Sequence, residues 1–472
     1  MTQQPTDWRD GLSPSVVDEV DHIIRACAAG PDVEPGGDEG AEDGPVSIGV
    51  ARRGNQLDYL YAEGQILVQD QYLARVLEIL DLPDEQTLRR DERRLISPVI
   101  AGVVLLAPPT GEGERPFLVP EALAAIDATF GPGVATPDHV LTVAGGEPSV
   151  CPATEPEEVY FDGEPFPPVC HENGGGTALV YVADTGLLRN AGADHSWLAG
   201  VRVENPAADY DAYKPPTPGH AAVPPIIPPY TGHGTFVAGV LRCMAPAADV
   251  VVAKASFAAG STLESRLVMR LEAAFGLAPD IFHVTLACPS RHDVPLIGFR
   301  EWLRQLRSRG GAVCIAPAGN SGMRRHSWPA AFADVVSVGA LGADWRGRAS
   351  FSNFGSWVDV YAPGRDLINA YTTGIYQCHV SPYANTDRTF YGMAKWSGTS
   401  FSTPIVSGLI AARMSATGES ARTATAALLA QAREDAVPGV GPVLLPRCRE
   451  TRPRACSCDC LCRHCGDRNR PR

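Results

Sequence analysis

The alternation of strand-like and helix-like segments between residues 178 and 341 constrains the fold of this chain most. The run 178–183 is continuously apolar and of strand length. Within 262–275 apolar side chains step by four, and within 296–309 they follow the i, i+3, i+4, i+7 spacing of an amphipathic helix. Further strands are expected at 249–256, 280–287, 311–316 and 335–341. A chain with this alternation forms an α/β domain, with a doubly wound, mostly parallel sheet.

Four polar residues lie where such a sheet places its chemistry, at strand ends and helix starts. Asp184 ends the first strand, and Asn320 follows a later one in Ala-Gly-Asn. His233 lies between two glycines at the start of a helical segment. Ser400 precedes Pro404, and proline suits the first helical turn. Ser400 is therefore expected at a helix N-terminus, where N–H groups and the helix dipole stabilise a negative charge.

Each of these residues has an ordinary structural explanation when taken alone. Asp-Thr-Gly and Gly-Asn are common turns, and a serine at a helix start is a common N-cap. Taken together they supply everything that acyl transfer by serine needs: a nucleophile, a base, an acid that orients the base, and oxyanion donors. The complete set favours a serine hydrolase.

Four sequence blocks resemble the signature blocks of the subtilisin-like serine peptidases, the subtilases. They are Asp184-Thr-Gly, Gly232-His-Gly-Thr, Ala318-Gly-Asn320 and Gly398-Thr-Ser400 with Pro404, and the resemblance covers about 177–435. It implies a serine endopeptidase that acts on polypeptides through an acyl-enzyme. Ser400 would be the nucleophile, His233 the general base and then acid, and Asp184 the orienting carboxylate. Asn320 and the Ser400 N–H would form the oxyanion hole.

The resemblance also implies a substrate-binding strand. Thr285, Leu286 and Ala287 stand where family members pair backbone to backbone with an extended peptide. This chain has Ala287 where the family usually has glycine, and Ser402 where it often has alanine. Two segments, 210–230 and 374–395, look inserted and are interpreted either as rims of the cleft or as neutral loops.

Two other functions are alternatives to that of an active subtilase. The first is a subtilase-fold binding or processing partner with little activity of its own, and the complete triad speaks against it. The second is an α/β-hydrolase esterase, which requires Gly-x-Ser-x-Gly and the chain order Ser, Asp, His. Neither requirement is met here.

A small module is predicted ahead of the peptidase domain. Residues 1–45 read as a short helix and an acidic linker, 46–146 as a ferredoxin-like β-α-β-α-β module, and 147–176 as a linker or surface arm. Within the module, strands are expected at 65–69, 98–107 and 139–143, and helices at 71–80 and 120–130. The module resembles the inhibitory prodomains of subtilases in size, position and pattern. We therefore predict self-cleavage between Ala144 and Gly176; the competing interpretation is a permanent N-terminal domain.

Composition and the N-terminal residues indicate which partners and which cellular location to expect. A net charge of −14 argues against binding nucleic acid, and the most apolar run, 98–109, is shorter than the ~20 residues of a membrane-spanning helix. The N-terminus has neither a basic nor an apolar signal region. A cytoplasmic location is expected, with export by another route left open, as is the oligomeric state.

The C-terminal segment 436–472 is rich in cysteine and arginine. Its cysteines include Cys456, Cys458, Cys460, Cys462 and Cys465, with His464 among them. Thiolates and an imidazole are adequate ligands for Zn²⁺ or Cu(I), but the spacing is not a pair of C-x₂-C knuckles, so a flexible tail is favoured over a zinc site. No cofactor is required by the chemistry. Binding of a calcium ion is left open, since no Asp-rich loop is recognised.

Overall fold

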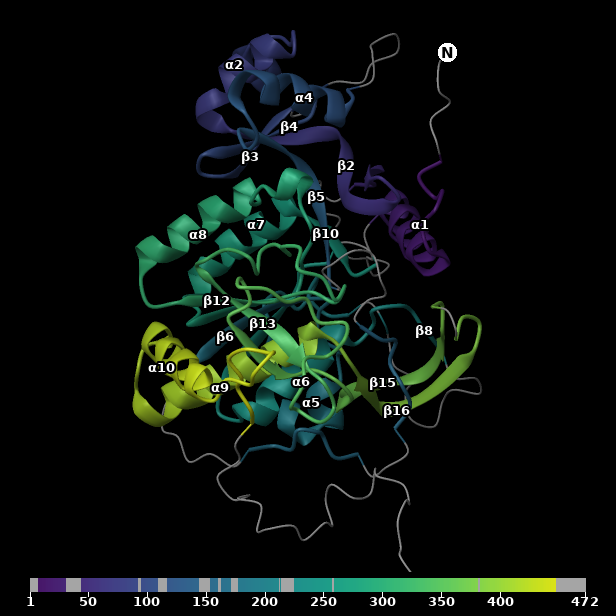
Figure 1. The fold of residues 1–472 in the computed structure, drawn as a ribbon, viewed down its shortest axis with the longest axis vertical. Coiled ribbons are helices and arrows are strands. Elements are labelled where there is room, and N and C mark those ends of the chain that lie inside the picture. Colours follow the sequence, from purple (N-terminus) through teal and green to yellow (C-terminus); the bar gives the residue numbers. More distant parts are fainter. Residues whose placement is uncertain are drawn as a thin grey trace, which may run out of the picture.

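The computed structural model describes residues 7–30, 44–91, 95–108, 117–143, 153–159, 163–170, 177–211, 213, 225–256, 259–380 and 383–446. An N-terminal module sits on the helices of a larger α/β domain (Figure 1). The cysteine-rich end of the chain, including the proposed metal ligands, lies outside the described residues.

A parallel sheet forms the centre of the α/β domain. Within the described residues its seven strands have the order β14-β13-β12-β11-β6-β9-β7, and every pair in it is parallel. The strands are β6 (Leu179–Asp184), β7 (Arg202–Val203), β9 (Asp249–Lys254), β11 (Ile281–Val284), β12 (Val313–Pro317), β13 (Val335–Leu341) and β14 (Val360–Pro363). The predicted doubly wound, mostly parallel sheet is confirmed.

Helices cover both faces of this sheet. One face packs on α6 (His233–Met244) and α9 (Thr399–Thr417), with α10 (Ala421–Glu434) outside α9. The other packs on α7 (Glu264–Ala273) and α8 (Ile297–Arg309). Shorter elements are α5 (Ala191–Asp194) and the 3₁₀ turns η2 (Ser196–Leu198), η3 (Ala274–Leu277) and η4 (Arg291–Asp293). The predicted apolar faces of 262–275 and 296–309 are the buried ones, although residues 261–263 form strand β10 (Ser261–Leu263) rather than helix.

The N-terminal module is an antiparallel sheet with helices packed on it. Its elements are α1 (Pro14–Ala29), β1 (Ile48–Arg53), β2 (Gln56–Gln69), η1 (Asp70–Tyr72), α2 (Leu73–Ile79), α3 (Glu85–Arg90), β3 (Ile96–Ile100), β4 (Val103–Leu106), α4 (Val119–Phe130) and β5 (Ala135–Thr142). The strand order is β5-β2-β4-β3, with β1 added to β2.

The single strand predicted at 98–107 is wrong, because the structure forms a hairpin there. β3 and β4 are antiparallel and turn at Gly102, whose φ of +91° suits glycine. The apolar run masked this turn, since both strands are largely buried. The order of strands and α-helices from β2 to β5 is therefore β-α-α-β-β-α-β.

The last strand of the module continues into the α/β domain. β5 pairs antiparallel with β10, with Thr142 opposite Ser261 and Val140 opposite Leu263. Thr142 also bridges to Ala287. Side chains from the module and from α7 and α8 share one hydrophobic cluster, in which Leu141 and Val143 lie. The end of the module is thus built into the domain that carries the polar motifs.

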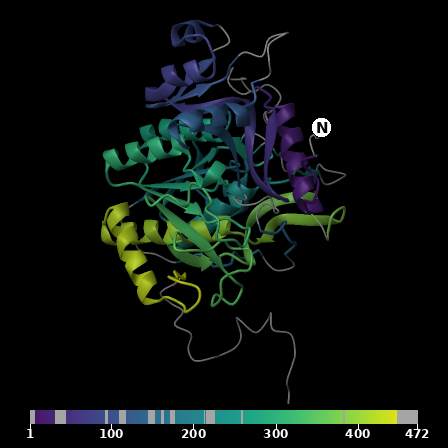
Figure 2. The same ribbon diagram turned by 45° about the horizontal axis from the view of Figure 1, so that its top comes forward.

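The two segments that look inserted meet in one small sheet. Its order among the described residues is β16-β15-β8, formed by β8 (Ile226–Ile227), β15 (Leu367–Gln377) and β16 (Asp387–Trp396). This sheet projects from the side of the domain in Figures 1 and 2.

The segment predicted to be a linker is bound along the same region. Glu157 exchanges backbone hydrogen bonds with Lys395, and Phe166 does so with Ile368. The described parts of 147–176 therefore lie against β15 and β16. None of the helices that the structure describes is long and apolar enough to span a bilayer.

Candidate active site

Asp184 and His233 form a buried hydrogen-bonded pair. Asp184 is the last residue of β6, and His233 is the first residue of α6. His233 Nδ1 lies 2.7 Å from Asp184 Oδ1, and both side chains are fully buried. Glycine is needed on both sides of the histidine. Gly232 has a φ of +76°, and a Cβ on Gly234 would collide with the carbonyl oxygen of Gly186.

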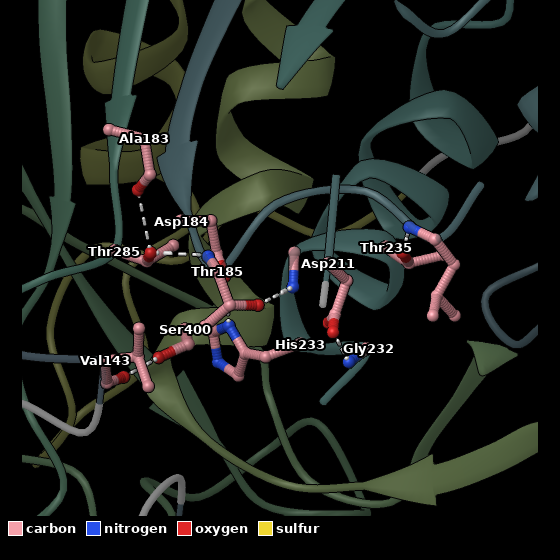
Figure 3. A network of polar contacts seen from close by, with 12 residues as sticks. Val143, Ala183, Asp184, Thr185, Asp211, Gly232, His233, Thr235, Thr285 and Ser400 are labelled. Atoms are coloured by element: carbon pink, nitrogen blue, oxygen red, sulfur yellow. Dashed lines mark hydrogen bonds and ion pairs between the residues drawn. The ribbon is translucent and has the colours of Figure 1, made fainter. Parts of the chain in front are cut away.

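Further donors fix the Asp184 carboxylate. Thr285 Oγ1 donates to Asp184 Oδ2 at 2.7 Å, and the Thr185 N–H donates to Oδ1 at 2.6 Å. Burial raises the pKa of Asp184, but the adjacent His233 and these hydrogen bonds lower it by more, so the net pKa lies below the ordinary 3.8. The carboxylate is therefore held ionised and facing the histidine (Figure 3).

Ser400 lies in the first turn of α9, and its hydroxyl meets the end of the module. Ser400 Oγ donates to the carbonyl oxygen of Val143 at 2.9 Å. In Figure 3 the His233 ring lies beside Ser400 on one side and Asp184 on the other. Within the described part of the chain, His233 Nε2 has no hydrogen-bond partner. The serine hydroxyl is thus engaged by the module instead of by the histidine.

Asn320 lies next to the same helix start. Its Oδ1 accepts from the N–H of Thr399 at 2.8 Å and from Thr399 Oγ1 at 2.9 Å. Both of these bonds hold the amide oxygen, so they orient the amide and leave its NH₂ as the donating end. Asn320 lies three residues after the end of β12 and is 5 % exposed. The arrangement therefore brings together the four residues predicted from the sequence.

The end of β5 occupies a groove between two backbone segments. The N–H and C=O of Thr142 pair with Ala287 at 2.9 Å each, and the Val143 N–H donates to the Gly260 carbonyl at 3.0 Å. Leu141 and Val143 are buried, whereas Thr142 is half-buried. A Cβ on Gly260 would lie 3.0 Å from Val143 Cγ2. An extended chain is thus held on both edges, with alternate side chains buried.

Of the three residues predicted to bind substrate, Ala287 pairs with Thr142 at the end of β5, whereas Thr285 contacts Asp184. The side chain of Thr285 bonds Asp184 and the Ala183 carbonyl. Leu286 is buried in the cluster that holds Leu141. Sequence reasoning missed this role of Thr285, because nothing in the sequence around it indicates that its hydroxyl faces Asp184.

Polar contacts also join the module to the domain. Asp138 accepts from the Ser265 N–H at 3.0 Å and from Ser265 Oγ at 2.6 Å, at the start of α7. Arg325 forms an ion pair with Asp58. Within the domain, the fully buried Glu264 accepts from the Gly298 N–H at 2.7 Å, which joins α7 to α8. No group of three or more potential ligands among the described residues is arranged to hold a metal ion.

Comparisons with known proteins find relatives for part of the chain. The chain is 31% identical over 189 residues to M-protease of Shouchella clausii (strain KSM-K16), covering 38% of this chain and 44% of that protein. It is 31% identical over 189 residues to Subtilisin Savinase of Lederbergia lenta, covering 38% and 62%. The intracellular serine protease of Paenibacillus polymyxa is 30% identical over 200 residues, covering 40% and 55%. The matched part thus spans from 44% to 62% of these relatives.

Solved structures give matches of low TM-score. A cold adapted subtilisin-like serine proteinase has a TM-score of 0.42 and 21% identity, covering 59% of this chain and 92% of that one. The Prenylagaramide maturation protease PagA has a TM-score of 0.41 and 24% identity, covering 55% and 85%. The family model described as Subtilase family matches residues 175–442, more than half of the chain. The chain belongs to the subtilase family.

Proposed function

We propose that this chain is a serine endopeptidase that hydrolyses peptide bonds through an acyl-enzyme on Ser400. The observation that carries the proposal is that three groups lie together. They are the buried Asp184–His233 pair, Ser400 beside it, and the Val143 carbonyl that the Ser400 hydroxyl contacts. Two further donors, the Asn320 amide and the Ser400 N–H at the start of α9, suit a developing oxyanion.

The reaction follows from these roles. His233 Nε2 takes the proton of Ser400 Oγ as the oxygen attacks the peptide carbonyl carbon, and Asp184 holds the imidazole in the tautomer that leaves Nε2 free to accept. The carbonyl oxygen becomes an oxyanion facing the Asn320 amide. His233 then gives its proton to the leaving amine, and an ester to Ser400 forms. Water, activated by His233, hydrolyses the ester and restores the serine.

The substrate is an extended polypeptide, and we expect it to bind as the end of β5 around Thr142 does. Backbone bonds to Gly260 and Ala287 would hold a substrate of any sequence. The burial of Leu141 and Val143 on either side of the half-buried Thr142 favours substrates with apolar residues at alternate positions.

The same contact supports self-cleavage at the end of the module. The Ser400 hydroxyl contacts the Val143 carbonyl, so the first peptide bonds after Val143 are the ones nearest to the nucleophile. We place the cleavage within 143–145, which includes the first bond of the interval predicted from the sequence and the bond just before it. A permanent, uncleaved domain is the competing account, and intact-mass measurement separates the two.

Labelling with a fluorophosphonate tests the proposed chemistry. This reagent reacts with a serine that a neighbouring base activates, so we expect label on Ser400 in purified wild type. The variants Ser400→Ala and His233→Ala should take none. Hydrolysis of an internally quenched peptide with the sequence of residues 139–148 should follow the same pattern. A folded wild type that neither takes label nor hydrolyses the peptide would leave a binding or processing partner with little activity.

A further inference from the structure

A second histidine lies buried inside the α/β domain, and the proposed reaction does not use it. His283 is on β11, fully buried, and its neighbours in the sheet are Val182 on β6 and Ile315 on β12. Its Nδ1 lies 2.8 Å from Ser407 Oγ.

This hydrogen bond joins the strand to the helix that carries the nucleophile. Ser407 is on α9, seven residues after Ser400, which is about two helical turns, so the two serines share one side of the helix. Thr285 directly follows β11, two residues after His283. Thr285 bonds Asp184, and His283 bonds α9. One strand therefore holds both the acid and the helix of the nucleophile.

The energetics indicate that this contact is a poor way to stabilise the fold. Burial lowers the pKa of His283 to about 4, with Asp184 raising it and His233 lowering it, so the ring is neutral at neutral pH. A neutral imidazole has one donor and one acceptor nitrogen, and His283 Nε2 has no partner among the described residues. An unsatisfied buried polar atom costs stability that an apolar side chain would not. A leucine would remove this cost, and it would leave Ser407 Oγ without its histidine partner.

We propose that His283 is a positioning residue, which through Ser407 fixes helix α9 so that the Ser400 hydroxyl stays aligned with the Asp184–His233 pair. The inference rests on the proposed function, because its effect is on the rate of the Ser400 reaction. Small displacements of a reacting group lower the rate strongly while leaving substrate binding intact. The signature is a loss of kcat without a loss of affinity or of stability.

Steady-state hydrolysis of the quenched 139–148 peptide and thermal melting test this in three variants. For His283→Leu we expect kcat to fall about tenfold with KM unchanged. The melting temperature should stay within about 3 °C of wild type or rise. Ser407→Ala should lower kcat by a similar factor, and the double variant should be no worse than either single, because both remove the same bond.

Matched controls separate positioning from general damage. Ser415 lies buried on the same helix and donates to the Ala411 carbonyl, away from His283. Ser415→Ala should therefore keep wild-type kcat. His283→Asn retains a hydrogen-bonding group near the position of Nδ1 and should recover most of the activity. The inference is overturned if His283→Leu keeps full kcat, if its loss only follows a lower melting temperature, or if Ser407→Ala behaves like Ser415→Ala. A wild type with no Ser400-dependent hydrolysis would instead refute the proposed function, and this inference with it.

Discussion

At the scale of single residues, the Asp184–His233 pair depends on a neighbouring side chain, Thr285. Thr285 supplies Asp184 Oδ2 with a hydrogen bond of 2.7 Å, which supports the ionised form of the acid. The four motif residues were predictable because each lies in a short glycine-flanked block. Thr285 was not, because only the register of β11 against β6 brings its hydroxyl to Asp184.

The first prediction concerns the variant Thr285→Val, which keeps the shape and removes the hydroxyl. A hydrogen bond to a charged group contributes ~1.5–3 kcal/mol, so kcat should fall about tenfold or more. The pKa of Asp184 should rise, because a hydrogen bond that supports the ionised carboxylate is gone. Thr285→Ser, which restores the hydroxyl, is the control. Equal kcat for the valine and serine variants would contradict this role.

The second prediction concerns acid stability. The pKa of His283 is about 4 in the folded protein and 6.5 in its ordinary state, so the unfolded chain binds the extra proton between these values. Stability from this group is complete above pH 6.5 and falls as the pH drops toward 4, by about 3 kcal/mol in total.

Urea unfolding at pH 7 and at pH 4.5 measures this effect, with Ser400→Ala as the background so that no self-cleavage occurs. His283→Leu should lose clearly less stability on acidification than the parent does. The same drop in both proteins would show that His283 is not a buried neutral group.

At the scale of elements, the N-terminus of α7 is completed by the module. Its N-cap residue is Leu263, which has no side chain that can accept a hydrogen bond. Asp138 on β5 accepts the Ser265 N–H instead. The periodicity of the sequence predicted the helix, but a cap supplied by a residue more than a hundred positions away leaves no local signal. The hairpin at β3 and β4 escaped prediction for a related reason, since a buried turn looks like one apolar run.

The third prediction is that Asp138→Ala weakens the docking of the module. Loss of a capping acceptor costs ~0.5–2 kcal/mol, so the Ser400→Ala chain with Asp138→Ala should unfold at lower urea concentration. Asp138→Asn keeps an acceptor and should lose less. An alanine variant as stable as the parent would mean that Asp138 does not cap α7.

The contribution of Asp138 also carries a pH dependence. Burial raises its pKa to about 6, while hydrogen bonds from Ser265 and Gln65 act in the opposite direction. A raised pKa makes the proton-linked stabilisation complete below pH 3.8 and lost as the pH rises through 6. The asparagine variant should lack this dependence in the same urea experiment.

At the scale of the whole molecule, the module and the peptidase domain form one continuous structure. β5 extends from the module and pairs with β10 and Ala287. The next residue, Val143, accepts a hydrogen bond from the Ser400 hydroxyl. The sequence predicted both parts and their order, because each has its own hydrophobic periodicity. It could not predict that Val143 contacts the Ser400 hydroxyl, since that depends on how the surfaces of the module and the domain fit together. The described part of the following segment returns to the domain, with the Ala153 N–H bonded to the Ser397 carbonyl.

Intact-mass measurement on purified wild type and Ser400→Ala tests the central claim most directly, namely that Ser400 cleaves peptide bonds and that the end of β5 lies in its substrate groove. We predict two fragments from wild type, divided at a bond within 143–145, and one full-length mass from Ser400→Ala. Thr285→Val should give the same fragments more slowly. Wild type that remains full length while hydrolysing the quenched peptide would contradict self-cleavage and establish a permanent N-terminal domain, and cleavage that persists in Ser400→Ala would contradict the role of Ser400 itself.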